Sequence, residues 1–302
     1  MNSFEYWDSY RRTIRTRIGK WLGGEDVIVR GYKLLHDLLP ELSLMQLQVL
    51  NVTGRLVSAP LAQWLEKSFF MVSYPDVRIW CNQIAALAGA DGASPVAAAA
   101  AACLSADSRA YGSSQTQWLA MTALRDMRQK HAAGVPLAEL VARFPIKHGL
   151  PAIMGFARPA NKIDERLEPM RRLTEKLGFE PGPHQVFADE LAEWLQREYG
   201  ADMNIAGFMA AFLLDQAFTP EEVYQLRALA VANGAMACYG DRLGQPEFTF
   251  LPQRCGDVVY CGPEIRSLPS TPLNDCWATG HPPASGADPT APYCPESAPP
   301  AP

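Results

Sequence analysis

Two cations near the middle of the chain follow a glycine-containing loop. Lys162 and Arg166 fall in the first turns of a helix expected over residues 161–177, and Gly155 lies in the loop before it. Backbone N–H groups at a helix start, the positive end of the helix dipole and side-chain cations all favour an anion. This segment, residues 148–178, therefore predicts a site for a carboxylate or a phosphate.

An amphipathic helix must position these cations. Its apolar residues recur at intervals of three and four, which puts them on one face; they are Ile163, Leu167, Met170, Leu173 and Leu177. Gly178 follows the last of them as a helix-stop signal. His148 opens the preceding loop and is either part of the site or a structural residue.

Helical signals extend along most of the chain. Ser43 with Gln46 forms a capping box, and Ser94 and Thr219 each precede a proline suited to the first helical position. Helices are expected over residues 4–22, 59–72, 75–89, 95–104, 114–130 and 220–239, and an extended piece over residues 26–32. The helix over residues 95–104 has small side chains on every face and is expected to pack on several sides. No alternating strand pattern of any length is present, so we expect an all-α protein.

Length and composition exclude several classes of protein. The chain has 302 residues, 48% of them hydrophobic, and a formal net charge of −5, so nucleic acid is not an expected partner. No apolar run reaches the roughly 20 residues that a membrane-spanning helix needs. The first residues lack the apolar core of a secretory signal. We therefore expect a cytoplasmic protein without a membrane partner.

The composition changes near Gly240 to proline, glycine, cysteine and serine. Residues beyond about 280 are proline-rich, and we expect them to be disordered. The cysteines of this extension lack a Cys-x-x-Cys pair, so a zinc site has little support and no metal site is predicted; they are Cys255, Cys261, Cys276 and Cys294.

The central segment resembles the signature of the citrate synthase superfamily, which includes the citryl-CoA lyases. The run that carries the resemblance consists of Gly155, Phe156, Ala157, Arg158 and Pro159, followed by Lys162, Asp164, Glu165 and Arg166. It is similar to the family's glycine-phenylalanine-glycine-histidine-proline and aspartate-proline-arginine motifs. Two shorter runs, at residues 30–32 and 53–56, are also similar to family motifs, and the resemblance extends over residues 27–240.

The resemblance implies a domain arrangement and an assembly. A large helical domain would comprise residues 1–110 and 219–245, and a smaller helical domain, residues 111–218, would be inserted in it. Residues 246–302 would form the C-terminal extension. By the same resemblance we expect a homodimer, or a heterodimer with a paralogue.

The resemblance also indicates which chemical groups have changed. The family uses two histidines and an aspartate, and Tyr111, Arg158 and Ala206 stand at these positions. A phenol donates a hydrogen bond but exchanges protons less readily than imidazole, and a guanidinium cannot act as a base. Tyr111 is either a hydrogen-bond donor to substrate or a packed hinge residue. Another family histidine falls near Ser73 or Tyr74.

The remaining site residues follow from the same motifs. Arg166, with Asp164 beside it, stands at a carboxylate-binding position of the family, and His148 and Asn204 are further candidates for substrate binding. Lys162, Gly155 and Phe156 are the candidates for CoA binding. No cofactor is expected, although a CoA thioester fits as a substrate.

Two hypotheses follow. In the first, the protein is a repurposed acyltransferase or lyase that forms or cleaves a carbon–carbon bond in an acyl-CoA or polycarboxylate, with Tyr111 and Arg158 as catalytic groups. In the second, it is a non-catalytic relative that binds a small acid or a partner protein. Loss of the family's base at Ala206 agrees with the second hypothesis, whereas polar replacements at the two histidine positions favour the first.

Overall fold

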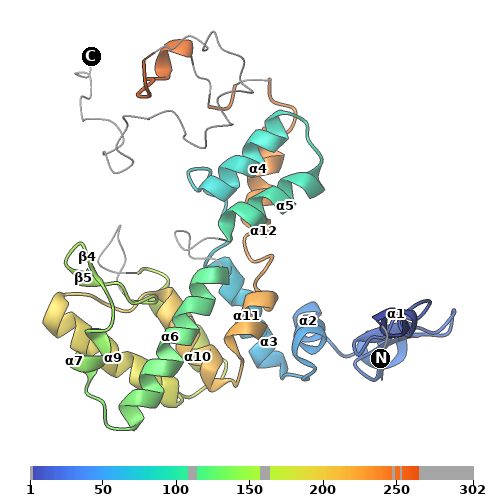
Figure 1. Ribbon diagram of the computed structural model, residues 1–302, viewed down its shortest axis with the longest axis horizontal. Coiled ribbons are helices and arrows are strands. Elements are labelled where there is room, and N and C mark those ends of the chain that lie inside the picture. The colour runs from blue at the N-terminus through green and yellow to red at the C-terminus, as the bar shows by residue number, and fades with distance from the viewer. Residues whose placement is uncertain (1–2, 108–113, 157–163, 247–248, 252–253, 265–302) are drawn as a thin grey trace. The chain divides into compact units, whose positions relative to one another are not determined.

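The structure is a computed structural model that describes residues 3–107, 114–156, 164–246, 249–251 and 254–264. Helices dominate these residues, and the predicted all-α class is confirmed (Figure 1). The chain divides into two units, Met1–Phe250 and Leu251–Pro302. The described part of the second unit holds one short 3-10 helix, Cys255–Asp257.

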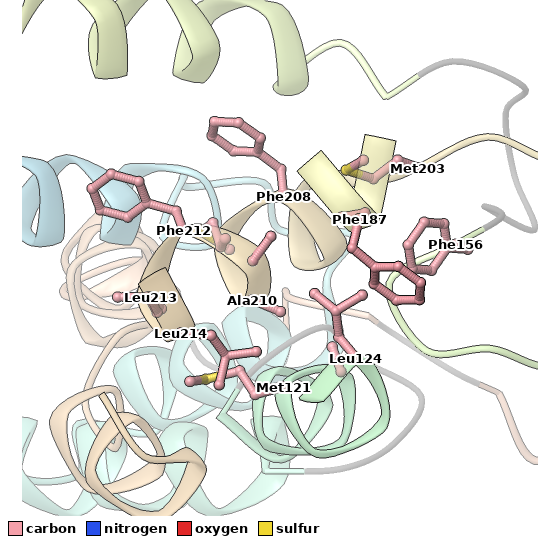
Figure 2. Close-up of a cluster of buried hydrophobic side chains, with 14 of the residues drawn as sticks. Met121, Leu124, Phe156, Phe187, Met203, Phe208, Ala210, Phe212, Leu213 and Leu214 are labelled. Carbon is pink, nitrogen blue, oxygen red and sulfur yellow. The ribbon is translucent and has the colours of Figure 1, made fainter. Parts of the chain in front are cut away.

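A buried helix forms the centre of the main core. In α10 (Ile205–Asp215) ten consecutive residues are buried, so this helix is covered on all sides. It packs against α6 (Ser114–Ala132) and α9 (Pro183–Tyr199), and in Figure 2 Met121 and Leu124 of α6 point toward these two helices. Trp64 stacks on Phe212 with ring centroids 4.0 Å apart.

Further helices surround this core. They are α2 (Leu44–Thr53), α3 (Ala59–Phe70), α7 (Leu137–Val141), α8 (Leu167–Lys176) and α11 (Pro220–Leu226). Capping boxes at Ser43 and Thr219 and the N-cap at Ser94 begin helices as predicted. A short hairpin, Ile146–Lys147 (β4) and Leu150–Pro151 (β5), leads into the central segment.

A second, smaller core is formed by α4 (Trp80–Ala90), α5 (Pro95–Ala106) and α12 (Ala232–Arg242), which lie side by side (Figure 1). Gly89 permits the close approach of α4 to α12, because a Cβ there would lie 2.3 Å from the Tyr239 carbonyl oxygen. The expected division at residues 111 and 218 stays a prediction.

The helix expected over residues 95–104 packs less completely than predicted. In α5, Ala98, Ala102 and Ala106 are buried on one face. Val96 and Leu104 are 77% and 78% exposed on the other. The prediction of packing on several sides is therefore wrong for the single chain, and an apolar helix face is left open.

The expected N-terminal helix over residues 4–22 is wrong. The helix α1 (Ser3–Asp8) is followed by an irregular segment and a three-stranded antiparallel sheet, Gly19–Trp21 (β1), Val27–Val29 (β2) and Tyr32–Lys33 (β3). Gly23 and Gly24 adopt positive φ angles and turn the chain between β1 and β2, so they serve a hairpin rather than a helix end. The extended piece expected over residues 26–32 is confirmed.

The single helix expected over residues 220–239 is two helices. α11 ends at Leu226, and α12 begins at Ala232. Carbonyl groups at the break accept hydrogen bonds from other elements: Leu226 from the Gln48 side chain and Arg227 from the Ser114 hydroxyl. The Gln48 bond satisfies the Leu226 carbonyl, which a continuous helix would pair locally, and the Arg227 carbonyl also accepts from the Ala230 N–H. Periodicity cannot reveal bonds between distant elements.

Candidate functional site

Arg166 and Asp164 form a bidentate ion pair at the start of α8. The Nε and Nη2 atoms of Arg166 donate to the two Asp164 carboxylate oxygens, each at 2.8 Å. Nη1 of Arg166 donates to the Met71 carbonyl at 3.0 Å. The Asp164 side chain is 1% exposed and that of Arg166 is 23% exposed. The carboxylate is therefore hidden, while the guanidinium reaches the surface.

Asp164 also accepts a hydrogen bond from the start of α10. The Ile205 N–H donates to Asp164 Oδ2 at 3.0 Å. Burial acts to raise the pKa of Asp164, but the hydrogen bonds from Arg166 and Ile205 outweigh it and lower the pKa to about 2. The carboxylate is thus ionised at neutral pH and joins the central segment to α10.

Asn204 begins α10. Its side-chain oxygen accepts from the Ala206 N–H at 2.9 Å, which makes it the N-cap. Ala206 is buried, and its methyl offers no group for proton transfer. Asn204 and Asp164 are both predicted to bind substrate, but here their side chains bind backbone groups at the start of α10.

Gly155 and Phe156 hold the central loop against the same helix start. Gly155 has a φ of +96°, and a Cβ there would lie 2.8 Å from the Gly207 Cα. The Gly155 carbonyl accepts from the Asn204 N–H at 3.0 Å, and Phe156 pairs with Met203 as an isolated bridge. Contact with CoA, predicted for Gly155 and Phe156, stays a prediction.

A pocket of about 380 Å³ lies beside Arg166, lined by Phe70, Met71, Tyr74, Glu165, Arg166 and Pro169. Arginine carries five N–H groups, so one hydrogen on each terminal nitrogen of Arg166 remains for a ligand. Because Asp164 already pairs with Arg166, the pair is electrically neutral. The pocket offers hydrogen bonds of fixed direction more than net positive charge.

The other predicted site residues lie apart from this pocket or outside the described residues. Tyr111, Arg158 and Lys162 fall outside them, so their roles stay predictions. His148 is exposed at the tip of the β4–β5 hairpin, with a φ of +51°. No described hydrogen bond or ion pair brings His148 to Arg166.

Glu165 and Tyr74 also line the pocket, and the sequence alone predicts no role for either of them. In the sequence, Glu165 belongs to the family-like run, and Tyr74 lies where a family histidine is missing. Glu165 lies in a turn between two charged residues, so hydrophobic periodicity does not mark it. Only the fold brings Glu165 close to Tyr74. The signal that could have marked Glu165 is its position directly before Arg166.

Comparison of the sequence finds no matching family model and no matching curated protein sequence. Solved structures do match. Citryl-CoA lyase from Hydrogenobacter thermophilus superposes with a TM-score of 0.70 at 23% identity, over 85% of this chain and 98% of that chain. The chain has the citrate synthase fold.

Two further structures with the citrate synthase fold agree over much of the chain. ATP citrate lyase from Methanothrix soehngenii, in complex with citrate and coenzyme A, gives a TM-score of 0.67 at 16% identity, over 87% of this chain and 44% of that one. Citrate synthase from Thermoplasma acidophilum gives 0.59 at 15% identity, over 77% of this chain and 60% of that one. At these identities the likeness establishes the fold.

Two classes of feature are absent from the described residues. No helix among them has the length and apolar character to cross a bilayer. No three side chains of histidine, cysteine, aspartate or glutamate among them come together as a metal site.

Proposed function

We propose that the protein is a repurposed enzyme that forms or cleaves a carbon–carbon bond in an acyl-CoA or polycarboxylate substrate. The observation that carries the proposal is Arg166, which is fixed by Asp164 and Met71 at a pocket yet keeps N–H groups for a ligand. Such a preorganised guanidinium binds a carboxylate without first having to be ordered. The protein shares its fold with citryl-CoA lyase and citrate synthase, and this likeness supports the proposed chemistry.

The proposed chemistry follows from the groups at hand. Arg158 and Arg166 orient the acid, Lys162 faces the CoA phosphates, and Tyr111 donates a hydrogen bond to the developing enolate. Because Ala206 cannot remove a proton, the reaction is a cleavage or a decarboxylative condensation, which needs less base strength. Glu165 lines the pocket and acts as the base where the reaction needs one.

A non-catalytic role is the second candidate, and one observation favours it. Asp164 and Asn204 are committed to the N-terminus of α10, so part of the family-like pattern maintains the fold. In this case the protein binds a small acid or a partner protein, and Arg166 positions α8 through its bond to Met71.

Association with a second protein chain is compatible with both the enzymatic and the non-catalytic function. Val96 is exposed on the open face of α5, and Leu87 and Trp80 are exposed on α4, which packs against α5. Apolar faces of this kind are favourable in water only when another surface covers them. We infer a cytoplasmic homodimer, or a heterodimer with a paralogue, that covers this face.

Thermal denaturation with CoA, acetyl-CoA, oxaloacetate or citrate tests the enzyme proposal. We expect at least one of these compounds to raise the Tm of the wild type, because a ligand that binds the folded state stabilises it. The double variant Asp164→Asn/Arg166→Gln should remove this rise, because it takes away the guanidinium without leaving a buried carboxylate unpaired. Arg172→Gln, at an exposed arginine of the same helix, is the matched control and should respond like the wild type.

Turnover separates the two candidate roles. An enzyme that uses Tyr111 should lose most of its activity in Tyr111→Phe, which removes one hydroxyl, while ligand binding persists. A flat response of the wild type to all four compounds would contradict the enzyme proposal.

A further inference from the structure

The N-terminal arm, residues 3–22, exposes many large apolar side chains. It comprises α1, the irregular segment after it and β1, at the dark blue start of the chain in Figure 1. Ile14 is 95% exposed and Trp7 is 67% exposed. The exposed large hydrophobic residues of the arm are Phe4, Tyr6, Trp7, Tyr10, Ile14, Ile18, Trp21 and Leu22. Apolar surface gathered in this way marks a place of contact with another molecule.

Three aromatic rings of the arm form one cluster. The ring centre of Tyr6 lies 5.3 Å from that of Trp7 and 5.2 Å from that of Tyr10. The guanidinium carbon of Arg15 lies 5.6 Å from the centre of the Tyr10 ring. All three aromatic side chains are exposed, so the cluster is open to a binding partner.

The arm is basic although the chain as a whole is acidic. It contains five basic and two acidic residues, a net charge of +3, whereas the whole chain carries −5. Arg11 pairs with Asp8 at 3.2 Å. The ion pairs of the described residues include none of the other cations of the arm, which are Arg12, Arg15, Arg17 and Lys20. An anionic surface therefore attracts the arm and repels the rest of the chain.

A small sheet joins the arm to the main core. β1 pairs with β2 from Gly19 to Trp21. The Arg30 side chain, directly after β2, donates to the Asn51 carbonyl of α2 at 2.6 Å. A surface that binds the arm therefore also holds the folded body of the protein.

We propose that the N-terminal arm binds the surface of a membrane that contains anionic lipids. Its aromatic and aliphatic side chains enter the interfacial region, which favours tryptophan and tyrosine because their rings are apolar at one end and polar at the other. Its arginines and its lysine contact the anionic headgroups. Peripheral binding needs no membrane-spanning segment, so the lack of one in the sequence, from which we expected no membrane partner, does not oppose it.

The aliphatic residues of the arm favour a bilayer over single-stranded nucleic acid. Aromatic rings and arginines also stack on bases. Ile14 and Ile18, however, have no ring to stack, and they gain free energy when an apolar phase removes them from water. The cytoplasmic leaflet carries anionic lipids, so the proposal agrees with the expected cytoplasmic location.

The proposal does not depend on the proposed reaction. No residue of the arm lines the pocket beside Arg166. Substitutions in the arm should therefore leave the response to CoA and citrate unchanged, and either proposal can fail while the other passes.

Co-sedimentation of the full-length protein with vesicles tests the proposal. The probe is a vesicle of phosphatidylcholine with about 30% phosphatidylserine, and pure phosphatidylcholine is the comparison. We expect the wild type to bind the anionic vesicles at least about tenfold more tightly than the neutral ones. An ionic strength of about 1 M, at which the Debye length falls to ~3 Å, should release most of the protein.

Two double variants separate the apolar and the charged contributions. Trp7→Ser/Ile14→Ser removes apolar contacts, and Arg12→Gln/Arg15→Gln removes two cations. Each should weaken binding to the anionic vesicles by at least about tenfold. All four residues are exposed, so both variants should fold with the Tm of the wild type.

The control variant is Arg143→Gln/Arg172→Gln. It removes the same amount of charge at two exposed arginines outside the arm. It should therefore bind the anionic vesicles like the wild type.

The proposal is overturned if the wild type does not bind the anionic vesicles, or if either variant of the arm binds them as tightly as the wild type. Light scattering identifies the other occupant. If neither vesicle binds and the arm variants have a smaller molar mass than the wild type, a second copy of the chain covers the arm and the proposal is wrong.

Discussion

The Asp164 carboxylate contacts two separate parts of the chain. It accepts two hydrogen bonds from the Arg166 guanidinium, one from the Arg166 N–H and one from the Ile205 N–H, and it is almost completely buried. Such a group stabilises the protein only while it is ionised, because protonation removes both its charge and acceptor sites.

The stability of the protein should therefore depend on pH through Asp164. Its pKa in the folded chain, about 2, lies below the ordinary value of 3.8, so the unfolded state binds more protons between these values. The contribution is complete above about pH 4 and is lost as the pH falls toward 2. In Asp164→Asn, the fall in the free energy of unfolding over this interval should be smaller than in the wild type by roughly 2 kcal/mol. Urea denaturation at several pH values measures this, and parallel pH profiles would contradict it.

The sequence indicates some of these residues but not their partners. Arg166 was found through its motif, and its carboxylate neighbour Asp164 follows from a spacing of two residues. The bond from Asp164 to Ile205 spans 41 residues and carries no periodic signal.

At the scale of the helices, the sequence predicts well those features that depend on local signals and fails where distant elements are in contact. Capping signals are local, so Ser43 and Thr219 begin helices as expected. The break between α11 and α12 depends on Gln48 and Ser114, which come from distant elements. Local patterns could not predict it for this reason.

The contact between the central loop and α10 should be sensitive to one methyl group. Gly155→Ala places a Cβ 2.8 Å from the Gly207 Cα at a positive φ, so we expect a loss of about 2–3 kcal/mol in the free energy of unfolding. Gly149→Ala is the control: its φ of +80° is also positive, but nothing lies within 4 Å. It should lose only about 1 kcal/mol. Equal losses in urea denaturation would show that the close approach has no role.

At the scale of the whole molecule, the chain alone leaves apolar surface uncovered. The exposed residues of α5 include Val96 and Ala100, and α4 adds Leu87 and Trp80. The resemblance to a dimeric family and this open face support the same assembly.

The assembly should respond to charge on α5. We expect the wild type to behave as a dimer in size-exclusion chromatography with light scattering, and Val96→Glu/Ala100→Glu to be a folded monomer, because a buried unpaired carboxylate opposes association. Ile146→Glu, on the exposed β4–β5 hairpin, is the control and should remain dimeric. A wild type that is monomeric at every concentration would refute the dimer.

The C-terminal end of α3 contacts two arginines. Ser68 and Phe69 contact Arg227, and the Met71 carbonyl accepts from Arg166. One short backbone segment is thus a shared support, so a substitution that shifts the end of α3 should disturb the hydrogen bonds of both guanidinium groups together.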